Sequence, residues 1–151
     1  MAIATFGAGC FWSVEETFAA VDGVTDTQVG YMGGHTEEPD DAAVAAGGTG
    51  HAEVVQVEYD PAQVSFAALL AVFWGCHDPT TPDQQGADIG PEYRSVIFVH
   101  TDAQEAAAHA SREAEALSGR HADDIVTEIC PAGVFWIAAP EHQGYLARRR
   151  S

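Results

Sequence analysis

The sequence contains no lysine, and its six arginines face 23 aspartates and glutamates, which gives a net charge of -17. Three of those arginines lie together at residues 148–150, so the rest of the chain is more acidic still. A surface of this charge repels phosphate groups and anionic lipid headgroups. The charge therefore argues against nucleic-acid binding and against binding to a membrane surface.

Long hydrophobic runs are also missing. No apolar stretch approaches the roughly 18 residues that cross a bilayer, and the N-terminus carries no basic residue ahead of an apolar run. The sequence therefore predicts a cytoplasmic protein. With 151 residues, of which 46% are hydrophobic, the chain is long enough to build a core, and no linker divides it. We expect one domain over residues 1–151 and a monomer.

Cysteine is scarce and shows no pairing in its spacing. The three cysteines stand at positions 10, 76 and 130, with no Cys-x-x-Cys pair and no paired Cys/His spacing. This pattern argues against a zinc site or a disulfide framework, and no other ligand cluster indicates a metal or a cofactor. At least one thiol is therefore unpaired, and its surroundings must show whether it is reactive.

Hydrophobic patterning predicts strands at residues 2–6, 25–31, 53–59, 95–99 and 125–129. Helices are predicted from the glycine turn at 7–9 to residue 21, and over 66–74, 102–117 and 141–149. Irregular loops are expected at 35–50 and 77–91. The residues of the 102–117 helix expected to face inward are Ala107, Ala110, Ala114 and Leu117. This order predicts an α+β fold, a ferredoxin-like two-layer sandwich with helices packed on a mixed, mostly antiparallel sheet.

Cys10 is the cysteine with an informative setting. It follows a predicted strand and a glycine-rich turn, and it lies in the first turn of a predicted helix. Unpaired backbone N–H groups and the helix dipole favour an anion there, so we expect the pKa of the thiol to fall below its usual value of about 8.5. A cysteine at a strand–helix junction can also be an ordinary core residue, and both interpretations remain open.

Two aromatic residues and one acid strengthen the case for a reactive site. Phe11 and Trp12 point about 100° apart on a helix, so at least one can stand beside the thiol as a wall for a methyl group, although both can equally be core residues. Glu53 shares a strand face with Val55 and Val57. This predicts a buried carboxyl with a raised pKa that can act as a general acid, unless a bend at the end of the strand exposes it.

Histidines offer a different chemistry. His51 and His77 lie near the candidate segments, and a histidine base beside a cysteine is the arrangement of Cys/His hydrolases and acyl transferases. The sequence carries none of the local signatures of that class, but the alternative remains open. Candidates for a polar rim gather in and after the loop at 77–91: Asp78, Asp88, Tyr93 and Arg94.

Nine short motifs together resemble one family over nearly the whole chain. They are Gly9-Cys10-Phe11-Trp12, Gly30-Tyr31-Met32-Gly33-Gly34, Thr49-Gly50-His51-Ala52-Glu53, Tyr59-Asp60-Pro61, Phe73-Trp74-Gly75-Cys76-His77-Asp78-Pro79, Gln85-Gly86-Ala87-Asp88-Ile89-Gly90, Tyr93-Arg94-Ser95, Thr127-Glu128-Ile129 and His142-Gln143. In this order they resemble peptide-methionine (S)-S-oxide reductase, the A type of methionine sulfoxide reductase. No single motif is decisive, but nine in the right order are specific.

The resemblance implies a mechanism. By similarity, Cys10 attacks the sulfoxide sulfur of the S epimer, free or within a protein, and remains as a sulfenic acid when methionine leaves. Protonated Glu53 is expected to donate to the sulfoxide oxygen, and Phe11 and Trp12 to hold the substrate methyl group. No metal and no cofactor are implied.

The resemblance also assigns a pocket and exposes a difference. Tyr93 resembles the family's hydrogen-bond donor to the sulfoxide oxygen, and Asp88 resembles a polar residue that lines the same pocket. Many relatives carry a further tyrosine near Pro39, where this sequence has Asp41. An ionised Asp41 would keep the nearby glutamate protonated, but it would also raise the pKa of the thiol.

The C-terminal segment is the second difference. Many relatives carry a glycine-rich tail with a resolving cysteine, and this sequence has no cysteine after Cys130. We therefore expect a one-cysteine cycle in which thioredoxin, glutaredoxin with glutathione, or a small thiol reduces Cys10 directly. Resolution by Cys76 or Cys130 remains an alternative, as does a degenerate member that binds methionine sulfoxide without reducing it.

Overall fold

The computed structural model describes residues 1–149. Up to residue 99 the chain forms β1 (Ala2–Ala8), α1 (Phe11–Ala19), β2 (Val24–Met32), β3 (Ala52–Tyr59), α3 (Phe66–Gly75) and β6 (Ser95–Val99) as its main elements. The four strands lie in the order β6, β1, β3, β2, and each neighbouring pair is antiparallel. The expected ferredoxin-like α+β architecture is therefore confirmed.

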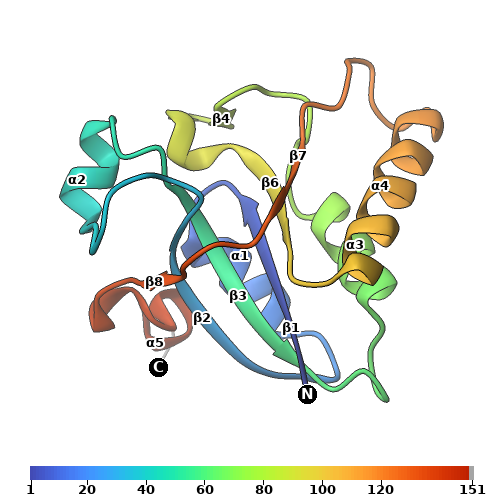
Figure 1. The fold of residues 1–151 in the computed structure, drawn as a ribbon, viewed down its shortest axis with the longest axis horizontal. Coiled ribbons are helices and arrows are strands. Elements are labelled where there is room, and N and C mark those ends of the chain that lie inside the picture. Colours follow the sequence, from blue (N-terminus) through green and yellow to red (C-terminus); the bar gives the residue numbers. More distant parts are fainter. Residues whose placement is uncertain (150–151) are drawn as a thin grey trace.

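The rest of the chain extends this sheet at both edges. Helix α4 (Asp102–Leu117) leads to β7 (Glu128–Pro131), which pairs in parallel with β6, and β8 (Trp136–Ile137) pairs antiparallel with β2. The complete sheet has the order β7-β6-β1-β3-β2-β8. Figure 1 shows the chain between β7 and β8 crossing the face of the sheet opposite α1.

Short elements interrupt the predicted loops. Residues 35–50 contain α2 (Asp41–Ala46), capped by the Asp40 carboxylate, which accepts a 2.8 Å hydrogen bond from the Ala43 N–H. Residues 77–91 contain the hairpin of β4 (Gln84–Gln85) and β5 (Asp88–Ile89) and the 3-10 turn η1 (Pro91–Tyr93). The helix predicted at 141–149 is instead the 3-10 turn η2 (Pro140–His142) followed by α5 (Tyr145–Arg149), because Gly144 breaks the segment with a φ of +60°.

The last major strand starts later than the hydrophobic pattern predicts. β7 begins at Glu128, opposite Val96 of β6, and the predicted start at residue 125 is wrong. The reason is a competing hydrogen bond: the Val126 N–H donates to the Pro79 carbonyl oxygen at 2.9 Å. This bond ties the segment before β7 to the loop after α3.

Helix α4 buries a different face from the one predicted. Of the four residues predicted to face inward, Ala107 is partly buried and packs against the core, but Ala110 and Ala114 are exposed and Leu117 is 81% exposed. The buried residues of the helix are Gln104, Ala108 and Glu115. The Gln104 amide has internal partners, and it donates a 2.8 Å hydrogen bond to the carbonyl oxygen of residue 3 in β1. A pattern that counts only apolar side chains therefore selects the wrong face.

The main core lies between the sheet and helices α1, α3 and α4. Phe6 of β1 stacks on Phe18 of α1 with ring centroids 4.9 Å apart, and packs on Phe73 of α3 at 5.4 Å. On the opposite face, Val54 of β3 and Phe98 of β6 belong to a smaller core that the chain between β7 and β8 covers. Because β3 is covered on both faces, it can hold a polar side chain at its N-terminal end in a fixed position.

Helix α3 is strongly apolar, and its buried residues Leu69, Leu70 and Phe73 pack in the main core. It has only ten residues, whereas a helix that spans a membrane needs about 20. Among residues 1–149, no helix combines the length and the apolar character that crossing a membrane requires.

Candidate active site

Cys10 stands where β1 passes into α1. The preceding Gly9 has a φ of +97°, a left-handed conformation that glycine adopts readily, and an added Cβ would lie 2.8 Å from the Gln85 side chain. Cys10 is the N-cap residue of α1, and the backbone N–H groups of Trp12 and Ser13 interact with its sulfur. The turn therefore presents a partly buried thiol at the helix N-terminus, as the sequence predicts.

Burial raises the pKa of the Cys10 thiol above its ordinary value. The N–H groups at the helix N-terminus lower this pKa, but the negative charges of Glu53 and Asp88 raise it further. The prediction of an unusually acidic thiol is therefore wrong, because burial and two neighbouring carboxylates outweigh the helix N-terminus. Protonation of Glu53 removes one of those charges.

Glu53 is the second residue of β3, and its partly buried carboxyl lies against the start of α1. Its Oε1 accepts a 3.2 Å hydrogen bond from the N–H of Phe11, the residue that follows the thiol. Burial raises the pKa of Glu53 to about 7; the Phe11 bond opposes the rise, and the negative charges of Glu92, Asp88 and Asp41 add to it. The predicted rise is confirmed, and near pH 7 about half of the molecules carry a neutral Glu53.

Tyr31 is a residue of this site that lies in one of the nine motifs but was given no role from the sequence. It lies opposite Glu53 in the register of β2 and β3, and its buried ring lies 5.7 Å from the ring of Phe11. Within the described part of the chain its hydroxyl is buried without a hydrogen-bond partner. Burial and then the charges of Asp41 and Glu53 raise its pKa, so the hydroxyl keeps its proton and can donate it in a hydrogen bond. Only the pairing register, which the sequence does not state, brings Tyr31 beside Glu53.

Tyr93 and Asp88 reach the same site from η1 and β5. Burial raises the pKa of Tyr93 to about 12, and the charges of Glu53, Asp88 and Glu92 add to the rise, so the Tyr93 hydroxyl is protonated at neutral pH. Asp88 is exposed, and its charge raises the pKa of both Cys10 and Glu53. The structure thus brings both predicted residues to the thiol, together with buried Glu92, which no motif singled out.

Phe11 and Trp12 occupy different environments. Phe11 is buried and packs on Tyr31 in the core. Trp12 is only partly buried: its ring stacks on Tyr145 of α5, with centroids 3.8 Å apart and planes 8° apart. The Trp12 Nε1–H donates a 3.0 Å hydrogen bond to Nδ1 of His142. Phe11 therefore belongs to the core beneath the thiol, and Trp12 lies at the surface beside it.

Asp41 is the first residue of α2, and its side chain is 61% exposed. Its Oδ2 lies 3.3 Å from Nε2 of His142, the histidine that accepts the Trp12 hydrogen bond. The negative charge of Asp41 raises the pKa of Glu53, as expected from the sequence, and that of Tyr31. Asp41 therefore acts on the acid by charge while its side chain is paired elsewhere.

The two candidate histidines are occupied away from the thiol. His51 is buried; its Nδ1 accepts a 3.0 Å bond from the Gly34 N–H and its Nε2 lies 2.7 Å from the carbonyl oxygen of Thr36. His77 lies 2.8 Å from the Phe73 carbonyl oxygen through Nδ1. No histidine of residues 1–149 hydrogen-bonds Cys10, so the Cys/His hydrolase lacks its base there. Those residues also contain no group of three or more histidine, cysteine or acidic side chains that could hold a metal ion.

Two residues of the predicted polar rim hold loops in place. The Arg94 guanidinium donates a 3.0 Å hydrogen bond to the Gly50 carbonyl oxygen and forms a 3.3 Å ion pair with Glu128. Asp78 is joined to Gln85 by two hydrogen bonds between its backbone and the Gln85 amide, at 2.9 and 2.8 Å. Because Gln85 packs against the turn before Cys10, Asp78 supports that turn indirectly.

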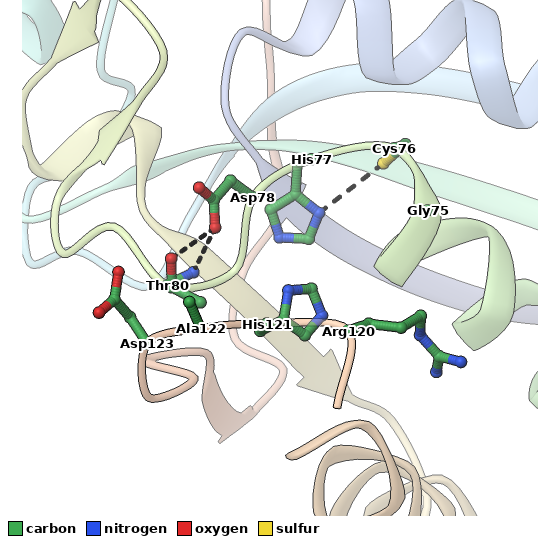
Figure 2. Close-up of a pocket in the computed structure, with 9 residues that line it drawn as sticks. All are labelled: Gly75, Cys76, His77, Asp78, Thr80, Arg120, His121, Ala122 and Asp123. Atoms are coloured by element: carbon green, nitrogen blue, oxygen red, sulfur yellow. Dashed lines mark hydrogen bonds between the residues drawn. The ribbon is translucent and has the colours of Figure 1, made fainter. Parts of the chain in front are cut away.

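Cys76 and Cys130 are free thiols on other elements. Cys76 ends α3, where its thiol donates a 3.3 Å hydrogen bond to the Phe73 carbonyl oxygen, and burial raises its pKa to about 11. Figure 2 shows Cys76 and His77 on one wall of a cavity of about 570 Å³, with Arg120 and His121 on another. Cys130 is partly buried in β7, and burial raises its pKa as well. Neither thiol has a hydrogen bond to Cys10 among the described residues.

The chain matches the family model described as peptide methionine sulfoxide reductase over residues 2–151. It is 61% identical to the peptide methionine sulfoxide reductase MsrA of Methanoculleus marisnigri over 146 residues, which cover 97% of this chain and 89% of the relative. The corresponding protein of Geobacter sulfurreducens is 60% identical over 146 residues, which cover 97% of this chain and 90% of that relative.

Solved structures also superpose on this chain over nearly its whole length. The reduced form of Mxr1 from Saccharomyces cerevisiae superposes with a TM-score of 0.90 at 33% identity, covering 99% of this chain and 86% of that one. A structure of Mxr1 in complex with Trx2 superposes with a TM-score of 0.64 at 29% identity, covering 95% and 84% of the two chains. The similarity therefore extends over the strands, helices and turns that surround the thiol.

Proposed function

The chain belongs to the peptide methionine sulfoxide reductase family, and from that membership and the geometry around Cys10 we propose how it works. The activity is thiol-dependent reduction of methionine sulfoxide to methionine. We assign Cys10 as the nucleophile, Glu53 as the proton donor, and the S epimer, free or within a protein, as the substrate. The observation that carries this assignment is a carboxyl with a pKa of about 7, hydrogen-bonded to the residue that follows a thiol at a helix N-terminus.

The chemical step needs one proton and one electron pair. The Cys10 thiolate attacks the sulfoxide sulfur with its electron pair, while Glu53 gives its proton to the sulfoxide oxygen. The bond formed between the two sulfur atoms and the sulfur–oxygen bond of the substrate then both break as the oxygen is transferred to the Cys10 sulfur, where it forms a sulfenic acid, and methionine leaves. The substrate sulfur is reduced by two electrons and Cys10 is oxidised by two. The proton that Cys10 gives up replaces the one that Glu53 donates.

Two tyrosines complete the oxygen site in this proposal. The buried Tyr31 hydroxyl has no partner among residues 1–149, and the Tyr93 hydroxyl keeps its proton at neutral pH. Both hydroxyls lie close enough to Glu53 for its negative charge to raise their pKa. Donors fixed in advance stabilise the negative charge that grows on the oxygen as the substrate bond breaks. Trp12 forms the apolar wall for the methyl group in this proposal, and the buried Phe11 lies beneath it as the floor.

We propose that an external thiol regenerates Cys10. One thiol attacks the sulfenic acid, releasing water and forming a mixed disulfide, and a second thiol releases Cys10. The complex of Mxr1 with Trx2 supports thioredoxin as such a reductant. Glutaredoxin with glutathione, or a small thiol, can serve in the same step. Cys76 is a weak candidate for an internal resolving thiol, because its pKa of about 11 leaves it almost wholly protonated at neutral pH.

Single-turnover mass spectrometry tests this proposal. The reduced protein is mixed with an excess of methionine sulfoxide and no reductant, then trapped with a reagent specific for sulfenic acids. We expect one methionine released per chain, the S epimer consumed, and one oxygen added to the peptide that contains Cys10. Methionine release without an added oxygen or a trapped adduct on that peptide would contradict the assignment of Cys10.

A double variant, Cys76→Ser with Cys130→Ser, is the control for the one-cysteine cycle. It should give the same single turnover and the same thiol-driven steady-state rate as the parent protein. A double variant that completes the first turnover but no longer turns over with thiols would show that one of these cysteines resolves the sulfenic acid. The two results separate the first chemical step from its regeneration.

A further inference from the structure

We infer that Asp41 is a positioning residue for the reductase reaction, acting through His142 on the indole of Trp12. The inference rests on the proposed function, because it concerns the aromatic wall assigned to the substrate methyl group. It goes beyond the proposed function because it assigns Asp41 a role in orienting the Trp12 side chain.

The direction of the hydrogen bond between Trp12 and His142 follows from the donor group. The indole Nε1–H of Trp12 can only donate, so Nδ1 of His142, 3.0 Å away, must accept and carries no proton. The ring proton of a neutral His142 is then on Nε2, which lies 3.3 Å from Oδ2 of Asp41. The carboxylate thus selects the histidine tautomer that leaves Nδ1 free to accept from Trp12.

Stacking alone does not fix the orientation of Trp12. The Tyr145 ring lies nearly parallel to the indole, with 8° between the planes and 3.8 Å between the centroids, so it fixes the plane of the indole. Two flat stacked rings can still slide and turn within that plane. The hydrogen bond at the edge of the indole removes this freedom, and the Asp41 carboxylate holds the acceptor that makes it.

Asp41 and His142 come from separate parts of the chain that are anchored independently. Asp41 opens α2, whose N-terminus is capped by Asp40. His142 ends η2, next to Gln143, whose side chain is hydrogen-bonded to the backbone of Val29 at 2.9 and 2.8 Å. The pair therefore joins two segments whose backbones are held by their own contacts. Loss of the Asp41 carboxylate should release the histidine ring without unfolding either segment.

Asp41 has two effects, and two substitutions separate them. Its charge raises the pKa of Glu53, and its Oδ2 lies 3.3 Å from Nε2 of His142. Asp41→Asn removes the charge but keeps an oxygen that can accept from Nε2, whereas Asp41→Ala removes both. An effect of Asp41→Ala that Asp41→Asn does not share is therefore positional. Asp40→Asn is the matched control, because it removes a neighbouring charge, keeps a residue that caps α2, and has no contact with His142.

The experiment combines an NMR signal with kinetics. The full chain is labelled with 15N-tryptophan, which gives three indole N–H signals, and the Trp12 signal is assigned by its loss in Trp12→Phe. In Asp41→Ala we expect the Trp12 signal to move toward the position of an indole that is not hydrogen-bonded, and KM for methionine sulfoxide to rise by about three- to tenfold, with kcat falling less. Asp41→Asn and Asp40→Asn should keep both the signal and KM within about twofold of the parent.

Three results would overturn the inference. An unchanged Trp12 signal in Asp41→Ala would show that the carboxylate does not hold His142. Equal effects of Asp41→Asn and Asp41→Ala would show that only the charge matters. A moved signal with an unchanged KM would show that the orientation of Trp12 does not affect substrate binding. Because the NMR signal is measured without substrate, it distinguishes a failure here from a failure of the proposed reaction.

Discussion

Two helix ends in this protein carry the pairs Gly-Cys and Phe-Trp, with the order of the two pairs exchanged. In Gly9-Cys10-Phe11-Trp12 the cysteine precedes α1, and backbone N–H groups lie toward its sulfur. In Phe73-Trp74-Gly75-Cys76 the cysteine follows α3, and its thiol donates to the Phe73 carbonyl oxygen. A helix offers donors at its N-terminus and acceptors at its C-terminus, so the first end favours a thiolate and the second favours a thiol.

The comparison also shows that the helix end alone does not set the reactivity of the thiol. Burial raises the pKa of both thiols, so a helix N-terminus alone does not make Cys10 acidic. What distinguishes the Cys10 end is a partner that exchanges protons near pH 7, the Glu53 carboxyl. The Cys76 end has His77 instead, a base whose pKa burial lowers to about 4 and which is therefore neutral at pH 7. Reactivity follows from the pair of groups rather than from the cysteine.

Replacing each cysteine by serine gives the largest expected difference between the two ends. Cys10→Ser should reduce methionine formation by at least about a thousandfold, because a serine hydroxyl is almost never ionised at neutral pH. Cys76→Ser should stay within about twofold of the parent, because a serine hydroxyl can donate to the same Phe73 carbonyl oxygen. Methionine is quantified by chromatography with dithiothreitol as the reductant. Comparable losses in both variants would contradict the comparison.

Removing the acid from the Cys10 end should give the next largest effect. Glu53→Gln keeps the size of the side chain but cannot transfer a proton, so we expect the single-turnover rate to fall by about a hundredfold. In the parent, the reactive form has the proton on Glu53 and none on Cys10. Its population rises as pH passes about 7, where the pair loses its first proton, and falls above the pKa of the thiol.

Single-turnover rates against pH check this prediction without interference from the reductant. The rising limb near pH 7 should be absent in Glu53→Gln, whose slow rate should continue to rise until Cys10 itself ionises. Asp88→Asn is the control, because it removes a nearby exposed charge and keeps the acid. If the limb near pH 7 persists in Glu53→Gln, another group is the acid.

The contributions of Glu53 and His77 to the stability of the protein should change with pH in opposite directions. The pKa of Glu53 is about 7 in the fold against 4.5 for an ordinary carboxyl, so the native state holds a proton that the unfolded chain loses, and stability falls as pH rises from 4.5 to 7. The pKa of His77 is about 4 against 6.5, so the unfolded chain gains a proton that the native state refuses, and stability falls as pH drops from 6.5 to 4. Each shift corresponds to roughly 3 kcal/mol.

Urea unfolding of Glu53→Gln and His77→Gln at several pH values measures these contributions. Relative to the parent, Glu53→Gln should gain roughly 3 kcal/mol of stability between pH 4.5 and pH 8, and His77→Gln should gain a similar amount as pH falls from 6.5 to 4. The informative quantity is how the difference in unfolding free energy between variant and parent changes with pH, because each substitution also changes that free energy by an amount that does not depend on pH. Parallel curves for variant and parent would contradict the corresponding shift.

The sequence was sufficient for the architecture and for the family, and it singled out Cys10 and Glu53, which the structure brings together at the start of α1, but it did not give the energetics of the site. Strand periodicity placed Glu53 on a buried face, and the glycine turn placed Cys10 at a helix start. Tyr31 was missed because its role depends on the register that sets it opposite Glu53. The inward face of α4 was wrong because buried Gln104 and Glu115 have polar partners that no hydrophobic pattern records. The pKa of Cys10 was wrong because burial depends on elements far apart in the sequence.

The smallest expected difference between the two ends is in alkylation, and it sharpens the comparison most directly because it needs no substrate. At pH 8 a thiol with a pKa of about 11 is roughly 0.1% ionised, so Cys76 should react slowly with iodoacetamide although it lines an open cavity. Cys10 should react about tenfold faster or more, because the N–H groups of Trp12 and Ser13 partly offset its burial.

The rates are read by peptide mass spectrometry in a Cys130→Ser background, with the unfolded chain as the reference in which both cysteines should react alike. Equal rates in the folded protein would mean that the direction of the helix has no effect on the thiol, and the difference in activity would then have to come from Glu53 alone.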